Sequence, residues 1–326
     1  MDLFHIRKSL PWRVTMLKRR GIDIVYRWEG NPIITIEDFS FKCSDIRNAG
    51  AVKVDGEYIL LVTIQGLEGH YSIYTARSTD GYHFEMDDGP FMAPSREEEF
   101  RIYEELGVLD ARVVPLDGSY YISYSALGLH GYRLGLARTD NFRTAQRIGL
   151  VSEPDTKGGS LFPRKIGGRY VRLERPREGS SIWITYSEDL EYWGWSEVVM
   201  TPRAGFWDSD RIGVAVPPME IDQGWLLIYY GAKQTSAGPL YRLGAAILDS
   251  EDPSKVIGRT NIPILSPREE YERIGDVPNI VFSCGAIVEP DDEVKLYYGA
   301  ANSCICVGTT KVQEIVRICK ESAEEF

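Results

Sequence analysis

The stretch EELGVLDARVVPLDGSYYISYSA, residues 104–126, decides the fold of this chain. Its centre is the tight-turn dipeptide Asp117-Gly118, which lies between an apolar run and a strand rich in tyrosine. A turn dipeptide between two such segments predicts a β-hairpin. Asp110 comes directly before the hairpin, where a rigid strand could hold its carboxyl in place for chemistry. On position alone the structural role is favoured, because turn aspartates commonly accept backbone N–H bonds.

The same pattern recurs along the chain. A turn dipeptide followed by an aromatic-rich strand is found at Asp55-Gly56, Asp117-Gly118, Gly167-Gly168, Gln223-Gly224 and Asp291-Asp292. The copies are spaced by roughly 50–70 residues, slightly more than the usual propeller repeats. Most copies are followed by a second strand and an acidic turn. Each unit is therefore expected to be a small antiparallel sheet with one buried face.

Stacking such sheets radially gives a β-propeller, so the repeats predict an all-β, five-bladed β-propeller. A β-sandwich is the alternative, but it does not predict the periodicity. The end of the chain differs, because Val312, Ile315, Val316 and Cys319 stand at helical spacing. We expect one catalytic domain over residues 1–326, with short helical segments near its termini. An N-terminal arm is expected over residues 1–28 and a C-terminal helix over residues 312–326.

Composition argues against several classes of function. The formal net charge of −11 disfavours binding to nucleic acid or anionic membranes, which both require a basic face. No apolar run approaches the ~20 residues of a membrane span, and residues 1–20 lack the apolar centre of a signal peptide. The five cysteines and four histidines show no metal-ligand spacing. We therefore expect a cytoplasmic protein with free thiols, no metal and no cofactor.

A set of motifs in a fixed order carries a resemblance to a known family. The motifs are NPIIT, RNAGAV, ARSTDGYHF, GVLDARV, LFPRKIGGRYVRLERP, GWLLIYYGA, DPSKVIGRT, DVPNIVFSCGAIV and YYGAAN. Together they resemble glycoside hydrolase family 130, the mannoside phosphorylases and their hydrolytic relatives. The resemblance covers nearly the whole chain after about residue 28.

The resemblance implies a role for Asp110. In the family motif (V/E)DPR the acid is the general acid, and here the motif reads VLDAR, with Ala111 in place of proline. Family members invert the anomeric centre, with inorganic phosphate as the attacking co-substrate. A hydrolase needs a second carboxylate to activate water, whereas a phosphorylase needs a single protein carboxyl. The resemblance implies that the aspartate delivers its proton through a sugar hydroxyl.

The resemblance also implies a phosphate site. Lys157, Arg175 and Arg211 match the family's basic phosphate-binding positions, and guanidinium groups suit phosphate oxygens. Tyr230 occupies the position of a histidine that contacts phosphate in many relatives, and its hydroxyl can still donate a hydrogen bond. Gly158 replaces an Asn or Asp beside the first basic residue. We expect these basic side chains, which belong to separate repeats, to share one central pocket.

The sugar-binding positions depart from the family pattern. Asn48 matches a position near the donor sugar, but Thr63 stands where relatives usually have Arg and Asn302 where they have Asp. The joint loss of one cation and one anion suggests a coupled change, so we predict a donor subsite altered from that of typical mannoside phosphorylases. Trp207, near Arg211 in the sequence, is the candidate platform for the acceptor sugar.

The predicted function is therefore that of an inverting glycoside phosphorylase, which transfers a mannosyl group from a β-mannoside oligosaccharide to phosphate and releases α-mannose 1-phosphate. An inverting β-mannosidase on the same fold is the main alternative. A non-catalytic carbohydrate-binding propeller is the third interpretation. The linkage, the acceptor and the oligomeric state stay open, and a homo-oligomer is considered only by analogy with relatives.

Overall fold

The repeats predicted from the turn dipeptides are β-hairpins in the computed structural model, which describes residues 17–18 and 21–324. Asp117-Gly118 joins β8 (Gly107–Leu116) to β9 (Ser119–Gly128), with φ angles of 50° and 78°. Asp55-Gly56 and Gly167-Gly168 also have positive φ at both positions. Two consecutive positive φ angles define the turn whose twist matches a β-hairpin, which explains the choice of Asp and Gly.

The remaining two hairpins differ in detail from the prediction. In the fourth, Ile221 pairs with Gly224, so the turn residues are Asp222 and Gln223. Gly224 has a φ of 125°, and a Cβ there would lie 2.2 Å from the carbonyl oxygen of Leu248. Glycine is therefore required one position after the turn. In the fifth, Asp291 and Asp292 lie in a longer loop, because Val288 pairs with Val294.

Four of the blades are continuous in sequence. Blade 1 contains β4 (Cys43–Val54), β5 (Glu57–Gly66), β6 (Tyr71–Ser78) and β7 (Glu85–Met92). Blade 2 contains β8, β9, β10 (Gly131–Thr139) and β11 (Gln146–Leu150). Blade 3 contains β12 (Thr156–Leu161), β13 (Tyr170–Pro176), β14 (Ile182–Ser187) and β15 (Gly194–Met200). Blade 4 contains β16 (Arg211–Val214), β17 (Met219–Ile221), β18 (Gly224–Thr235), β19 (Gly238–Leu248) and β20 (Val256–Arg259).

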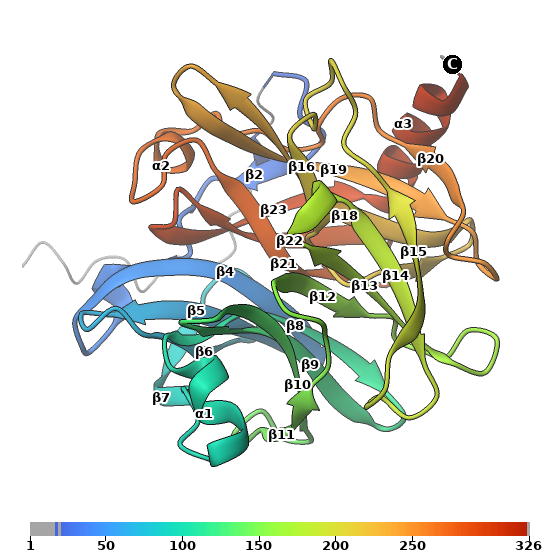
Figure 1. The fold of residues 1–326 in the computed structure, drawn as a ribbon. Helices are drawn as coiled ribbons and strands as arrows, with labels where there is room; N and C mark the ends of the chain where they lie inside the picture. Colours follow the sequence, from blue (N-terminus) through green and yellow to red (C-terminus); the bar gives the residue numbers. More distant parts are fainter. Residues whose placement is uncertain (1–16, 19–20, 325–326) are drawn as a thin grey trace, which may run out of the picture.

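Blade 5 is completed by the two ends of the described chain. Its C-terminal strands are β21 (Val281–Val288), β22 (Glu293–Ala300) and β23 (Cys304–Lys311). Its N-terminal strands are β1 (Leu17–Lys18), β2 (Tyr26–Trp28) and β3 (Ile34–Thr35). β2 and β3 both pair with β23, and Figure 1 shows blue β2 close to red β23. This pairing closes the ring of blades.

The closure corrects part of the predicted N-terminal arm at residues 1–28. Ile24 and Val25 are buried, and Arg27 forms ion pairs with Asp23 and Glu272. Residues 23–28 therefore pack into the propeller, where Tyr26 and Arg27 pair with β23. Residues 1–16 and 19–20 lie outside the described residues.

Apolar side chains form a separate cluster at each boundary between neighbouring blades. In β5, Leu60 belongs to the cluster between blades 5 and 1, whereas the next residue, Leu61, belongs to the cluster between blades 1 and 2. Successive side chains of a strand point to opposite faces. Both faces of the inner strands are consequently buried, which explains why EYILLVT is almost continuously apolar instead of alternating.

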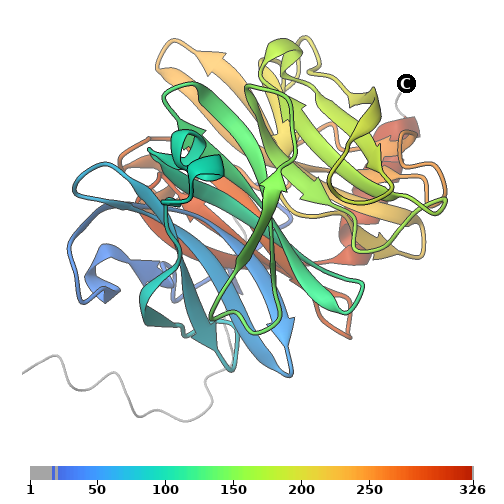
Figure 2. The same ribbon diagram turned by 60° about the horizontal axis from the view of Figure 1, so that its bottom comes forward.

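Short helices lie outside the blades, among them the C-terminal helix α3 (Val312–Glu324), which confirms the predicted terminal helix. The others are η1 (Ile36–Asp38), α1 (Glu98–Glu104), η2 (Glu178–Ser180) and α2 (Glu270–Arg273). Among the described residues, no helix has the length and apolar character needed to cross a bilayer. The strands follow one another around the molecule in chain order (Figure 2), and the predicted five-bladed propeller is confirmed.

Candidate active site

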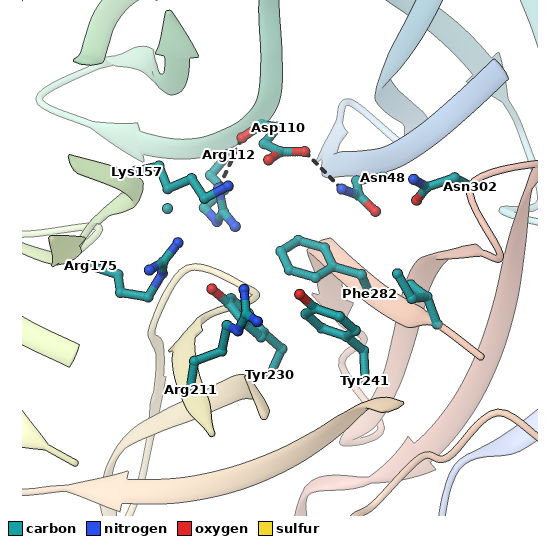
Figure 3. Close-up of a pocket in the computed structure, with 12 residues that line it drawn as sticks. Asn48, Asp110, Arg112, Lys157, Arg175, Arg211, Tyr230, Tyr241, Phe282 and Asn302 are labelled. Atoms are coloured by element: carbon teal, nitrogen blue, oxygen red, sulfur yellow. Dashed lines mark hydrogen bonds between the residues drawn. The ribbon is translucent and has the colours of Figure 1, made fainter. Parts of the chain in front are cut away.

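A pocket lies at the centre of the propeller, where side chains from all five blades converge (Figure 3). Its lining consists of Asn48, Asp110, Arg112, Lys157, Gly158, Arg175, Arg211, Tyr230, Tyr241, Ile280, Phe282 and Asn302. All the predicted site residues except Thr63 and Trp207 are in this lining. The fold therefore brings together residues that lie as far apart in the sequence as Asn48 and Asn302.

Irregular backbone on the inner strands directs side chains into the pocket. Bulges interrupt β4 at Asn48, β8 at Asp110 and β12 at Gly158. The three residues have φ angles of 25°, 58° and 66°. A bulge bends its strand and re-aims one side chain. The positive φ of Asp110 costs of order 1–3 kcal/mol for a residue other than glycine, so other contacts must hold it.

Three neighbours hold Asp110. Asn48 Nδ2 donates a hydrogen bond of 2.7 Å to Asp110 Oδ1. The backbone N–H of Asp110 donates to Thr63 Oγ1 at 3.0 Å, and its carbonyl oxygen accepts from Arg112 Nη1 at 2.9 Å. The backbone and one carboxyl oxygen are thus fixed, while the carboxyl group faces the pocket.

Thr63 differs from its predicted role as a sugar-binding residue. Its side chain is fully buried behind the pocket, where the hydroxyl supports the backbone of Asp110. It is not part of the pocket lining. Thr63 therefore supports the backbone of Asp110 instead of lining the pocket.

Arg112 ties the acid to the opposite side of the ring. Its Nε and Nη2 donate to the carbonyl oxygens of Ala215 and Val214, each at 2.9 Å. Only 2% of the residue is exposed, and its hydrogen-bond acceptors are carbonyl groups. Carbonyl groups satisfy the N–H donors without neutralising the guanidinium charge, so Arg112 adds a fixed positive charge to the pocket.

The predicted basic residues gather on one side of the pocket (Figure 3). Lys157 and Arg175 are direct partners on adjacent strands of blade 3. Arg175 is 4% exposed, and its Nε is buried with no hydrogen-bond partner among the described residues. Arg211 Nε donates to Asp210 Oδ2 at 2.8 Å. A buried guanidinium donor without a partner indicates a site for an anionic ligand.

The local electrostatics agree with an anion site. Burial, reinforced by the positive charge of Arg175, lowers the pKa of Lys157 to about 8, while the carboxylate of Asp110 opposes this shift. Arg211 also contributes to the lowering. Bound phosphate would offset the mutual repulsion of these cations, which are concentrated here although the chain as a whole is acidic.

Aromatic side chains from blades 4 and 5 form another wall of the pocket. The ring centroids of Tyr230 and Phe282 are 4.7 Å apart, and those of Tyr230 and Tyr241 are 6.1 Å apart. Burial raises the pKa of Tyr230, so its phenol stays protonated and can donate a hydrogen bond. Tyr241, Phe282 and Ile280 were missed by sequence reasoning, because only the closure of the ring brings them to the pocket. Ile280 and Phe282 lie within the quoted motif DVPNIVFSCGAIV, which was the available signal for them.

Trp207 does not lie in the pocket, and its predicted role as an acceptor platform is wrong. The residue is 7% exposed and its ring stacks on Tyr229, with centroids 5.5 Å apart. Gly231 and Gly244 make room for the indole. It lies in the turn before β16 and packs into the core between blades 3 and 4, whereas Arg211 begins the strand and lines the pocket. Asn302, in contrast, lies beside Asn48 in Figure 3.

Metal ligands are not clustered in the part of the chain that the structure describes. No group of three His, Cys, Asp or Glu side chains is placed to hold a metal ion there. All five cysteines are free thiols.

Comparison with known proteins gives consistent matches over most of the chain. A family model described as beta-1,4-mannooligosaccharide phosphorylase, of glycoside hydrolase family 130, matches residues 19–321. A 1,2-beta-oligomannan phosphorylase from Thermoanaerobacter sp. strain X514 is 38% identical over 82% of this chain and 90% of its own length. A beta-1,4-mannooligosaccharide phosphorylase from Ruminococcus albus is 29% identical over 94% of both chains.

Comparison with solved structures points to the same family. The beta-1,2-mannobiose phosphorylase from Listeria innocua, in complex with beta-1,2-mannobiose, superimposes with a TM-score of 0.84 and 31% identity. The match covers 91% of this chain and 99% of that chain. Sequence and structure together establish that the chain belongs to glycoside hydrolase family 130.

Proposed function

We propose that this protein is an inverting β-mannoside phosphorylase, which cleaves mannooligosaccharides with inorganic phosphate and releases α-mannose 1-phosphate. The observation that carries the proposal is the charge of the pocket lining. Among the described residues, the lining contains four cationic side chains and a single carboxyl group, that of Asp110. The names of the related phosphorylases support the same chemistry.

Phosphate is the proposed nucleophile. Lys157, Arg175 and Arg211 would hold its oxygens, with the hydroxyl of Tyr230 as a further donor. One phosphate oxygen attacks the anomeric carbon from the face opposite the leaving sugar. The bond from this carbon to the glycosidic oxygen breaks, and the leaving oxygen takes up a proton. The products are the inverted sugar 1-phosphate and a saccharide shortened by one unit.

Asp110 is the proposed source of that proton. Because Asn48 donates to Oδ1, the hydrogen bond favours placement of the proton on Oδ2. The proton then travels to the leaving oxygen through a sugar hydroxyl, as the family resemblance implies. General-acid assistance of this kind typically contributes ~10²–10⁴ in rate.

The charge of the pocket favours phosphorolysis over hydrolysis. An inverting hydrolase places a second carboxylate where it activates water. In this chain the corresponding side of the pocket carries Lys157, Arg175 and Arg211. These cations suit a phosphate dianion and would weaken a neighbouring carboxylate base by pairing with it.

The sugar side of the pocket is proposed to use Asn48 and Asn302 for donor hydroxyls and the aromatic wall for sugar faces. The proposal of an altered donor subsite now depends on Asn302 alone, because Thr63 lies behind the acid. A β-1,2 linkage is the first to test, since the relative named for it is 38% identical and the one named for β-1,4 is 29% identical.

The test compares β-1,2- and β-1,4-mannobiose with and without phosphate. We expect α-mannose 1-phosphate, detected by phosphorus and proton NMR, only when phosphate is present. Asp110→Asn is the matched inactive control, because it keeps the size of the side chain. Release of free mannose at the same rate without phosphate would overturn the proposal in favour of hydrolysis.

A further inference from the structure

Lys157 is held in the pocket by an aromatic ring and not by an acid. Its Nζ lies 4.3 Å from the ring centroid of Tyr132, which is on β10 of the neighbouring blade. Among the described residues, no carboxylate lies within ion-pair distance of Lys157, and no hydrogen bond from its ammonium is found. Arg211, in contrast, is paired with Asp210. The face of the Tyr132 ring is therefore a direct attractive contact of this ammonium group, whereas Asp110 acts on it without an ion pair.

An aromatic ring can hold a lysine side chain in place and still leave its ammonium group free to bind an anion. The ring face attracts the ammonium through its quadrupole, yet it takes none of the three N–H donors and adds no net negative charge. A carboxylate in the same place would occupy donors and neutralise the charge. The ring also counters repulsion, because Lys157 and Arg175 are adjacent across two strands. Tyr132 itself is half-buried, so its position is defined by the surrounding protein.

We propose that Tyr132 is a positioning residue for phosphate, which holds the ammonium of Lys157 in the pocket through the face of its ring. The identity of the anion rests on the proposed function. The effect of Tyr132 on the anion passes through Lys157, and the phenol hydroxyl is not required for it.

The proposal predicts different phosphate KM values for two substitutions of Tyr132. Tyr132→Phe keeps the ring face, so the KM for phosphate should stay that of the wild type. Tyr132→Leu removes the ring, so the KM for phosphate should rise by about 2- to 30-fold, the range for a cation–π contact of roughly 0.5–2 kcal/mol. The KM for the mannoside should not change in either variant.

A matched control lies in blade 3 outside the pocket. Lys165 Nζ is 4.2 Å from the ring centroid of Tyr170, which is nearly the same geometry. Neither residue lines the pocket. Tyr170→Leu also removes a ring from a lysine, but it should leave the KM for phosphate unchanged.

The pH dependence gives a readout that a purely structural role would not move. The charged groups that act on Lys157 are Arg175, Arg211 and Arg177, which lower its pKa, and Asp110, which raises it. Loss of the ring removes a stabiliser of the protonated form. In Tyr132→Leu the decline of phosphate affinity on the alkaline side should therefore begin at lower pH, whereas in Tyr132→Phe it should not move.

Two measurements keep this proposal separate from the proposed function. Calorimetric titration with inorganic phosphate in the absence of sugar reports on Lys157 without turnover. If wild type releases free mannose instead of mannose 1-phosphate, the proposed function fails, while the titration still tests Tyr132. If Tyr132→Leu does not fold, fluorinated phenylalanines at position 132 weaken the ring quadrupole in steps, and phosphate affinity should fall with each step.

Three results would overturn the proposal. The first is a wild-type affinity for phosphate in Tyr132→Leu or across the fluorinated series. The second is an equal loss in Tyr132→Phe, which would assign the effect to the hydroxyl. The third is a rise in the KM for the mannoside alone.

Discussion

The substitution Thr63→Val tests how Asp110, the proposed general acid, is held. Thr63 is fully buried, and its Oγ1 accepts the backbone N–H of Asp110 at 3.0 Å. Valine has nearly the same shape, so the change removes one hydrogen-bond acceptor without opening a cavity. The N–H of Asp110 then stays buried without a partner in a backbone conformation with a φ of 58°.

The expected magnitude follows from these contacts. A buried N–H that loses its acceptor destabilises the folded protein by about 1–3 kcal/mol. The left-handed conformation of Asp110 stores a strain of order 1–3 kcal/mol, which the lost bond no longer offsets. The bulge should relax and move the carboxyl away from Asn48. The kcat should fall. The largest possible decrease is roughly 10²–10⁴-fold, which corresponds to complete loss of general-acid assistance.

The assay combines denaturant unfolding with steady-state kinetics on mannobiose and phosphate. Thr63→Ser is the matched control, because it keeps the hydroxyl and removes one methyl group, at a cost of about 0.8 kcal/mol. Thr63→Val should lose both stability and kcat, while Thr63→Ser should retain kcat. The KM for the mannoside should be unchanged in both variants.

Two results would refute the reasoning. If Thr63→Val raises the KM for the mannoside and keeps kcat, then Thr63 contacts the sugar, as its sequence position first suggested. If Thr63→Ser loses as much kcat as Thr63→Val, then the methyl group and not the hydroxyl supports Asp110.

The remaining predictions concern the acid, the phosphate site and the core. Asp110→Asn should reduce phosphorolysis by ~10²–10⁴ while inorganic phosphate still binds in calorimetry, and loss of binding would contradict the separation of these roles. The affinity for the phosphate dianion should decline as the pH rises through about 8, because the pKa of Lys157 in the empty pocket is about 8 and a bound anion raises it. A KM for phosphate that stays constant to pH 10 would contradict this assignment. Trp207→Phe should lower the free energy of unfolding by about 1–3 kcal/mol, because the smaller ring leaves a cavity, without changing the KM for the acceptor, measured in the synthetic direction. An altered acceptor KM at unchanged stability would restore its role as a sugar platform.

Local chemistry made much of the fold predictable from the sequence. Turn residues such as Asp117-Gly118 specify a hairpin through the positive φ angles that they adopt at low cost, and this signal needs no distant contact. The helical spacing of apolar residues predicted α3 in the same way. The regular recurrence of hairpins then indicated a propeller, because each blade has to bury its faces against its neighbours.

The site was predictable only where a family motif marked it. The motif residues Asp110, Lys157, Arg175 and Arg211 do meet in one pocket. Trp207 was misplaced, because it lies in the turn before β16, and proximity to Arg211 in the sequence does not determine that this turn packs into the core between blades 3 and 4.

The sequence by itself determined the hairpins, their number and the residue types that the pocket collects. Only the tertiary structure decided how the ring closes, since the pairing of Tyr26 with Thr309 joins opposite ends of the chain and β2 is too short to have a local signature. It also placed Phe282 in the pocket, Thr63 behind the acid and Tyr132 beneath Lys157. The physical reason is the range of the interactions: turn chemistry and strand alternation act within a few residues, whereas contacts between blades depend on the radial packing of the complete ring.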